Sequence, residues 1–134
     1  MEHTTAEKMR WVRQPEEHFT GKAWMGVLSR ADDRVLNAIS VLFEPGARTH
    51  WHSHPEGQVL YVVSGTGWVG TEAGEIAHIS PGDVVYASPG ELHWHGATPD
   101  SPMSHLSLTT GGATVWEPRP VTDEEYSAAD SHGD

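Results

Sequence analysis

The chain has 134 residues, the size of one ordinary domain and enough to bury a core without disulfides. Its formal net charge of −11 argues against nucleic acid and anionic membrane surfaces as partners, because their phosphates would repel it. The absence of cysteine excludes disulfides and thiolate metal sites. Neither a secretory leader nor an apolar run of about 18 residues is found, so we expect a cytoplasmic protein with no membrane partner.

Short apolar stretches separated by turn residues run along most of the chain. Pairs such as Pro81-Gly82 and Pro89-Gly90 mark the turns, and β-branched residues are common between them. Many short strands with turns about every 8–12 residues are typical of an all-β sandwich or barrel. The predicted strands are 23–30, 35–43, 49–54, 58–65, 68–72, 75–80, 83–88, 91–97, 103–110 and 113–117.

The two ends of the chain differ from this pattern. The first residues show no clean period, and we assign 1–22 to an N-terminal arm ahead of a barrel over 23–120. Residues 121–134 form a short C-terminal helix and tail. The segment Thr122-Asp123-Glu124-Glu125 reads as a capping box, which predicts a helix over roughly 123–129. We expect the last five residues to lack regular structure.

Histidine is the unusual residue of this sequence, because six of its ten copies lie in groups, at positions 50, 52, 54, 93, 95 and 105. Side chains alternate between the faces of a strand, so His52 and His54 project from one face about 7 Å apart. That spacing suits two imidazole ligands of one metal ion. The turn 55–57 then brings Gln58 back beside them, and His93 is the natural third imidazole from another strand.

These residues sit in two motifs that resemble those of the cupin superfamily. The first reads Gly46-ARTHW-His52-Ser53-His54-PEG-Gln58-VLYVVS-Gly65, and the second reads Gly82-DVVYA-Ser88-Pro89-Gly90-Glu91-Leu92-His93. Gln58 stands where the family usually has Glu, and Ser88 stands where it usually has Pro. The resemblance implies an all-β double-stranded β-helix, the jelly-roll cupin barrel, with a metal ion held by His52, His54, Gln58 and His93.

Longer phrases resemble the small bacterial monocupins that include the manganese-dependent hydroxynitrile lyases. These phrases are FEPGARTHWHSHPEGQ, PGDVVYASPGELHWHGATP, MSHL and VTDEEY. In those enzymes three His and one Gln hold the metal, and a histidine on a later strand, matched here by His105, is the proposed base. The resemblance implies a lyase acting on a small hydroxy or carbonyl compound. It favours one manganese ion per chain, and imidazole plus oxygen also suits Fe, Ni, Co, Zn or Cu.

Three further histidines are candidates for the surroundings of the metal: His50 and His95 share strand parity with the candidate ligands, and His105 lies in a later strand. His50 is an alternative ligand, a support for a ligand or a strand-end residue. His95 and His105 are candidates for the catalytic acid or base, because histidine titrates near neutrality, and their alternative role is a structural hydrogen bond. Trp51 and Trp94 have the opposite parity, so we expect them to pack between sheets or at a dimer interface rather than line the site.

Four functions remain compatible with the sequence. The neutral oxygen of Gln58 leaves the ion more electrophilic than a carboxylate would, which favours the lyase. The alternatives are an O2-dependent cupin dioxygenase, a cyclase or isomerase of a polyketide- or sugar-like substrate, and a non-catalytic ligand-binding cupin. In each case the expected partner is a small molecule, and the likeness to other small cupins implies a homodimer.

Overall fold

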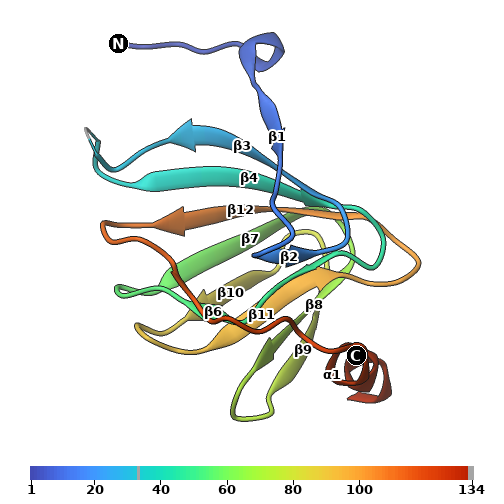
Figure 1. The fold of residues 1–134 in the computed structure, drawn as a ribbon. Helices are drawn as coiled ribbons and strands as arrows, with labels where there is room; N and C mark the ends of the chain where they lie inside the picture. Colours follow the sequence, from blue (N-terminus) through green and yellow to red (C-terminus); the bar gives the residue numbers. More distant parts are fainter. Residues whose placement is uncertain (33, 133–134) are drawn as a thin grey trace.

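The chain folds into two antiparallel β-sheets that face each other (Figure 1). The computed structural model describes residues 1–32 and 34–132. One sheet has six strands, in the order β1 (Trp11–Arg13), β3 (Ala23–Ser29), β4 (Asn37–Phe43), β12 (Met103–Thr109), β7 (Gln58–Gly65) and β10 (Val84–Ala87). The other has β13 (Val115–Trp116), β6 (His52–Ser53), β11 (His93–Ala97), β5 (Arg48–Thr49) and β2 (Phe19–Thr20) in that order, with β8 (Gly67–Thr71) paired to β11 and β9 (Ile76–Ile79) paired to β8. The predicted all-β jelly-roll architecture is confirmed.

Helical structure is confined to the two ends of the described chain. A single 3-10 turn, η1 (Ala6–Lys8), precedes β1, and the helix α1 (Asp123–Ala128) runs on into a 3-10 turn, η2 (Ala129–His132). The capping box is present, because the Thr122 hydroxyl accepts from the Glu125 N–H at 3.0 Å and the Glu125 carboxylate accepts from the Thr122 N–H at 2.9 Å. The predicted helix is therefore confirmed. Residues 130–132, expected to lack structure, belong to η2, and residues 133–134 lie outside the described residues.

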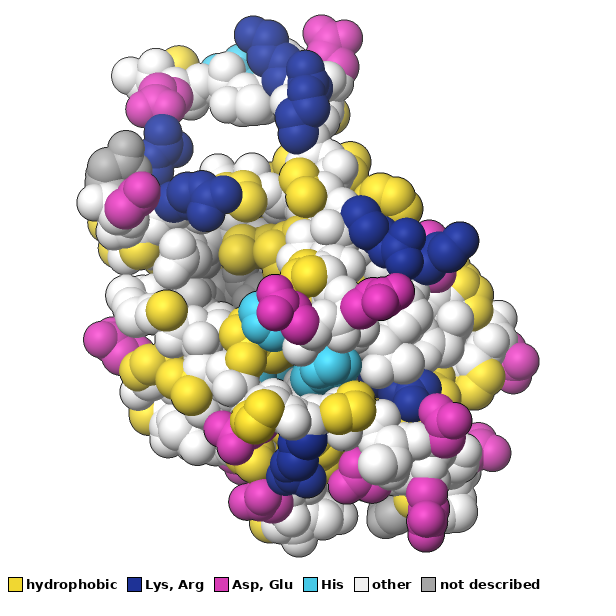
Figure 2. Space-filling model, viewed as in Figure 1, with side chains coloured by type: hydrophobic (Ala, Val, Ile, Leu, Met, Phe, Trp, Pro, Cys, Tyr) yellow, Lys and Arg dark blue, Asp and Glu magenta, His cyan; other side chains and the backbone are white. Residues whose placement is uncertain are grey.

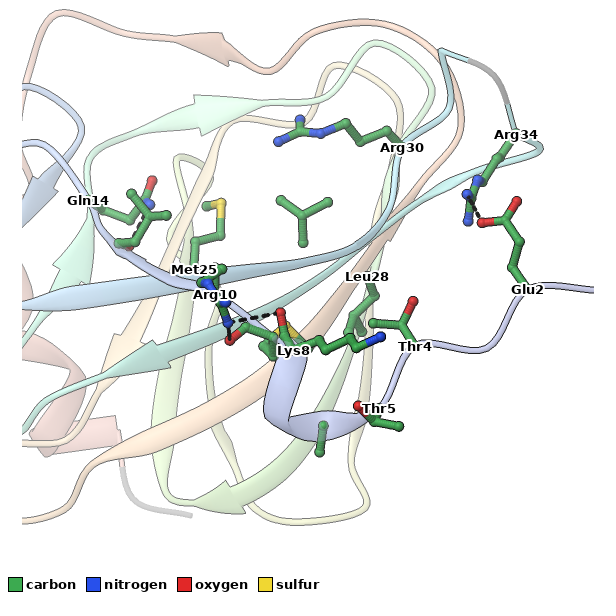
Figure 3. A pocket seen from close by; sticks show the side chains of 14 residues that line it. Glu2, Thr4, Thr5, Lys8, Arg10, Gln14, Met25, Leu28, Arg30 and Arg34 are labelled. Atoms are coloured by element: carbon green, nitrogen blue, oxygen red, sulfur yellow. Dashed lines mark hydrogen bonds and ion pairs between the residues drawn. The ribbon is translucent and has the colours of Figure 1, made fainter.

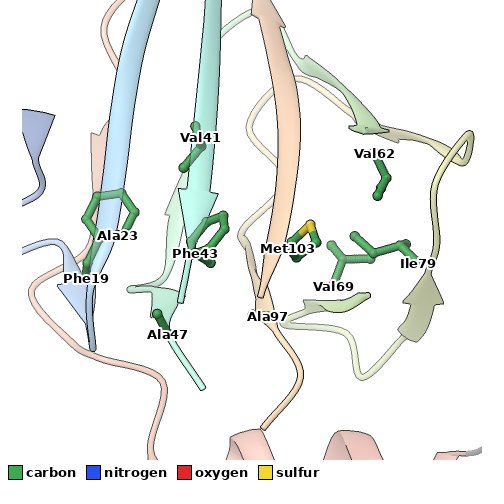
Figure 4. Packing of buried hydrophobic residues seen from close by; sticks show 10 residues of the cluster. All are labelled: Phe19, Ala23, Val41, Phe43, Ala47, Val62, Val69, Ile79, Ala97 and Met103. Carbon is green, nitrogen blue, oxygen red and sulfur yellow. The ribbon is translucent and has the colours of Figure 1, made fainter. Parts of the chain in front are cut away.

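The core lies between the two sheets, where inward side chains of both meet (Figure 4). Phe43 of β4 is fully buried, and its ring centroid lies 5.8 Å from that of His95 and 5.5 Å from that of His105. The apolar core therefore borders a group of buried histidines directly. Its members are Phe19, Ala23, Val41, Phe43, Ala47, Val62, Val69, Ile79, Ala97 and Met103.

A second apolar cluster lies on the outer side of the seven-stranded sheet, beneath α1 and η2. Trp51 and Trp94 pack there with Trp68, Val121 and Tyr126. The Tyr126 hydroxyl donates to the Ala97 carbonyl at 2.6 Å, which ties α1 to β11. The two tryptophans thus point away from the histidines, as their parity predicts. Their packing partner is the C-terminal helix rather than the opposite sheet.

The predicted strand 49–54 is interrupted at His50 and Trp51, which divide it into β5 and β6. The His50 N–H donates to the His18 carbonyl at 2.8 Å, and the Trp51 N–H donates to the Arg119 carbonyl at 3.4 Å. Because both amides bond to connecting segments rather than to one neighbouring strand, the strict alternation expected over 49–54 does not hold.

The first residues of the N-terminal arm, up to η1, stand away from the body of the protein, whereas its strand β2 belongs to the seven-stranded sheet and places Phe19 in the core (Figure 1). Its strand β1 pairs with β3, and a hollow of about 690 Å³ lies between the arm and β3 (Figure 3). Lys8, Arg10, Arg30 and Arg34 line this hollow, and Arg34 forms a 2.6 Å ion pair with Glu2. Basic side chains accordingly gather around the arm in Figure 2. Within the described residues, no helix is long and apolar enough to cross a membrane.

Candidate metal centre

Four strands and one turn deliver a cluster of buried polar side chains to the space between the sheets. His52 starts β6 and lies directly opposite His93, the first residue of β11, in the antiparallel register. Their ring centroids are 4.4 Å apart, and the His54 ring lies 5.1 Å from that of His52 and 5.6 Å from that of His93. Gln58 opens β7 beside them. The structure therefore brings together the four residues that the sequence nominates as ligands, all of them buried.

His95 also comes within ligand distance of the cluster. One ring nitrogen each from His52, His93 and His95 lies within 4.8 Å of the others, close enough for one ion to contact all three. The sequence places His95 among the catalytic candidates rather than the ligands. Thr49, on the neighbouring strand β5, helps to fix the position of His95, because the backbone N–H of His95 donates to the Thr49 hydroxyl at 3.2 Å.

Backbone carbonyls fix the protonation of two of these rings. The His52 Nδ1 lies 2.9 Å from the carbonyl of His50, and the His93 Nδ1 lies 2.8 Å from the carbonyl of Glu91. A carbonyl oxygen only accepts hydrogen bonds, so each Nδ1 carries the proton and each Nε2 keeps its lone pair. Neutral rings with a free Nε2, held by a second bond on the other side, are the form in which histidine binds metals.

The orientation of Gln58 supports the same interpretation. Its amide nitrogen donates to the Ser107 hydroxyl at 2.7 Å, so its amide oxygen points the other way, to 3.1 Å from the His93 Nε2. Neither of these two facing atoms carries a hydrogen. Two buried lone pairs directed at each other are unfavourable unless a cation lies between or beside them. The Nε2 of His54 is also buried and has no hydrogen-bond partner within the described chain. The donor set therefore fits a metal ion.

Burial keeps the histidines of this cluster neutral. Desolvation lowers the pKa of His54 and of His105 from 6.5 to about 4, and it also lowers the pKa of His93. For His52 and His95 the pKa is lowered well below 6.5, first by desolvation and then by the neighbouring histidines, whose positive charges would repel theirs. At neutral pH the whole cluster is thus uncharged and available to a cation.

His95 and His105 form a hydrogen-bonded pair at the edge of the cluster. The His105 Nε2 lies 3.0 Å from the His95 Nδ1, so one of the two donates to the other. The remaining nitrogens, the His95 Nε2 and the His105 Nδ1, are buried without a partner among the described residues. A proton arriving on one ring can therefore pass to the other along this bond.

A cavity of about 60 Å³ adjoins the cluster. Apolar side chains from β2, β3, β4 and β13 form one part of its wall, and the polar lining is His52, His54, Gln58, His95, His105, Ser107, Thr49 and Thr114. The ring of Trp116 lies 4.8 Å from that of His52 and stacks on His18 at 4.1 Å. Thr49, Ser107 and Trp116 were not nominated from the sequence, because only strand register, which has no local signal, brings them to the site.

His50 lies outside this cavity. The interruption of the strand at His50 and Trp51 turns Thr49, rather than His50, toward the site. The contribution of His50 is its carbonyl oxygen, which accepts from the His52 ring. The sequence left three roles open for His50, and this arrangement matches one of them, the support of a ligand.

The pKa values predict that acid destabilises the metal-free protein between pH 6.5 and about 4. In this window the unfolded chain binds protons at histidines that stay neutral when folded, so stability is fully present above pH 6.5 and falls as the pH drops. Each such histidine adds a slope of up to about 1.4 kcal/mol per pH unit. Urea unfolding of chelator-treated protein across this range measures the slope. His105→Gln should lower the slope by up to about 1.4 kcal/mol per pH unit, the share of one histidine. His3→Gln, at an exposed position, is the matched control, and a wild type whose stability does not change across this range contradicts the prediction.

Comparison with known proteins places this geometry in a family. A family model described as cupin domain matches residues 39–109. Over 116 residues the chain is 50% identical to an (R)-mandelonitrile lyase from Granulicella tundricola, covering 84% of this chain and 88% of that protein. A cupin-like protein from Thermotoga maritima superposes with a TM-score of 0.83 at 38% identity, covering 87% of this chain and 91% of that one. A polyketide cyclase from Streptomyces resistomycificus superposes with a TM-score of 0.70 at 18% identity, covering 97% of this chain and 93% of the other, a likeness of fold alone. The chain belongs to the cupin family.

Proposed function

We propose that this cupin is a metal-dependent lyase that cleaves a small hydroxynitrile into a carbonyl compound and cyanide. The observation that carries the proposal is the convergence of buried, neutral electron-pair donors on one point beside a cavity that also holds a histidine pair. The identity of 50% with an (R)-mandelonitrile lyase supports this reaction over the alternatives.

His52, His54, Gln58 and His93 are the proposed ligands, and His95 is close enough to replace one of them. Manganese is the first candidate, through the resemblance to the manganese-dependent lyases. The imidazole and amide ligands carry no charge, so the full charge of a divalent ion is left to act on a bound substrate. Such an ion would supply the positive charge that lowers the pKa of the substrate hydroxyl.

The chain itself provides the base. His105 or His95 takes the proton from the substrate hydroxyl, and the pair shares that proton along its 3.0 Å hydrogen bond. The oxygen then forms the carbonyl double bond, the carbon–carbon bond to the nitrile breaks, and its electron pair leaves with cyanide. Returning the proton to cyanide releases hydrogen cyanide and restores the neutral pair. No oxidant or reductant is needed.

The cavity of about 60 Å³ has room for about two water molecules, so its apolar walls suit at most a small apolar substituent of the substrate. Met25, Ile39 and Val41 line the cavity together with the histidines, and no carboxylate of the described residues lines it. An apolar wall excludes water, which strengthens the electrostatic interactions within the site. We expect the substituent on the hydroxynitrile to lie against these side chains.

Loss of one ligand should remove the metal. His52→Ala should lower the affinity for manganese by at least about 100-fold, since changing residues that merely orient ligands already costs 10–100-fold. Metal analysis after dialysis measures the content, and His3→Ala, an exposed histidine, is the control. Wild-type protein that binds no divalent metal, or His52→Ala protein that retains it fully, contradicts the proposed site.

Removal of the base should slow the chemistry and leave the metal bound. For His105→Ala we expect kcat for cyanide release from (R)-mandelonitrile to fall by about 10²–10⁴-fold, the usual contribution of acid–base catalysis. Cyanide release by the wild type should be the same with and without air. Turnover that requires dioxygen would replace the lyase with the dioxygenase alternative.

We also propose that the protein is a homodimer that forms through the outer face of the six-stranded sheet. The strands β4, β12, β7 and β10 contain no Asp, Glu, Lys or Arg, although the chain carries a net charge of −11. This sheet leaves Tyr61, Val63, Val84 and Tyr86 exposed. Two acidic copies repel each other over most of their surface, and an uncharged apolar face allows them to approach.

Light scattering tests the homodimer. The wild type should have twice the 14.7 kDa mass of the chain. Val63→Glu should shift the protein toward the monomer, because it places a charge in the contact. Val115→Glu, at an exposed position on the other sheet, should leave the mass unchanged. A monomeric wild type refutes the dimer.

A further inference from the structure

Resting on the proposed metal site, we propose that Ser107 is a positioning residue that holds the Gln58 amide with its oxygen toward the metal. Ser107 lies on β12 opposite Leu60 of β7, and Gln58 lies two residues before Leu60, on the same face of that strand. The two side chains therefore meet inside the barrel. Both are at least nine-tenths buried, and the Gln58 Nε2 donates to the Ser107 Oγ at 2.7 Å.

A glutamine ligand has a difficulty that a glutamate ligand does not have. Its amide has one end that accepts and one end that donates, and rotation of the terminal torsion exchanges them at small cost. Only the oxygen can bind a cation. In the reversed orientation the amide nitrogen would face the His93 Nε2, whose lone pair would accept from it. Without a metal ion, a hydrogen bond to His93 therefore favours the orientation in which the amide nitrogen, which cannot bind a cation, faces the cluster.

Ser107 removes this disadvantage. With the oxygen turned toward His93, the amide nitrogen points into the interior, where the Ser107 hydroxyl accepts its hydrogen. Without that hydroxyl, the productive orientation leaves a buried N–H unpaired. The reversed orientation leaves the amide oxygen unpaired instead, which proteins tolerate better than an unpaired N–H, and its nitrogen still donates to His93. A buried, unpaired amide hydrogen is costly enough to shift the equilibrium toward the reversed orientation.

The expected consequence is weaker metal binding. Converted to affinity, the usual cost of one unsatisfied buried group is the upper bound, because the reversed orientation loses a bond as well; Ser107→Ala should weaken manganese binding by up to about 150-fold. Ser107→Thr, which keeps a hydroxyl at the same position, should restore most of the affinity. A carboxylate accepts at both ends and has no wrong orientation, so in a Gln58→Glu background Ser107→Ala should change the affinity by no more than about 2-fold.

Calorimetric titration of the metal-stripped protein with manganese tests this inference. The proteins to compare are the wild type, Ser107→Ala, Ser107→Thr, Gln58→Glu and the Gln58→Glu/Ser107→Ala double variant. Equal affinity of Ser107→Ala and wild type overturns it. So does an equal loss from Ser107→Ala in the wild-type and the Gln58→Glu backgrounds, which would mean a general structural effect. If Ser107→Ala does not fold, Ser107→Cys, a weaker acceptor, should show an intermediate loss. A wild type that binds no manganese refutes the proposed metal site itself.

Discussion

Two local hydrogen bonds of the same kind set the chemistry of the cluster. In each of them a histidine ring donates to the carbonyl oxygen two residues earlier, from His52 to His50 and from His93 to Glu91. Each bond places the ring proton on Nδ1 and aims the lone pair of Nε2 inward. If either bond were absent, the ring could rotate or take the other tautomer. The lone pair of His93 that faces the Gln58 oxygen depends on the bond to Glu91, and the free Nε2 of His52 depends on the bond to His50.

The barrel converts this local feature into a site by strand register. His52 and His93 come from segments far apart in the chain and face each other because β6 pairs with β11. Gln58 and Ser107 meet because β7 pairs with β12. The core supports the other side, where Phe43 contacts both His95 and His105. Since packed interiors yield little, the positions of these side chains are fixed before any ligand arrives.

The sequence predicted the parts of the site that depend on short-range rules. The turn after His54 and the spacing of the two motifs placed His52, His54, Gln58 and His93 together, and the structure brings them together. The alternation of side chains along a strand did not predict the position of His50, because the backbone amides of His50 and Trp51 bond to connecting segments and interrupt the strand there.

The remaining site residues depend on pairing across the sheets. The approach of His95 to the ligand group, the hydroxyl of Ser107 and the ring of Trp116 against His52 all follow from which strands are neighbours. The fold was predictable because turn residues recur along the whole chain and the motifs resemble a known family. The packing partner of Trp51 and Trp94 was not, because nothing in β6 or β11 indicates that α1 folds back over them.

A glutamine at this position suits the burial of the site. Gln58 has only 4% of its surface exposed, and an ionised carboxylate at that depth would need a partner charge whenever the metal is absent. An amide avoids that cost and leaves the metal-free cluster neutral, in keeping with the lowered pKa values of its histidines. The neutral amide has the disadvantage that only one of its ends can serve as a ligand. A hydroxyl on the neighbouring strand is the least costly correction, because it pairs the donor end without introducing charge into the barrel.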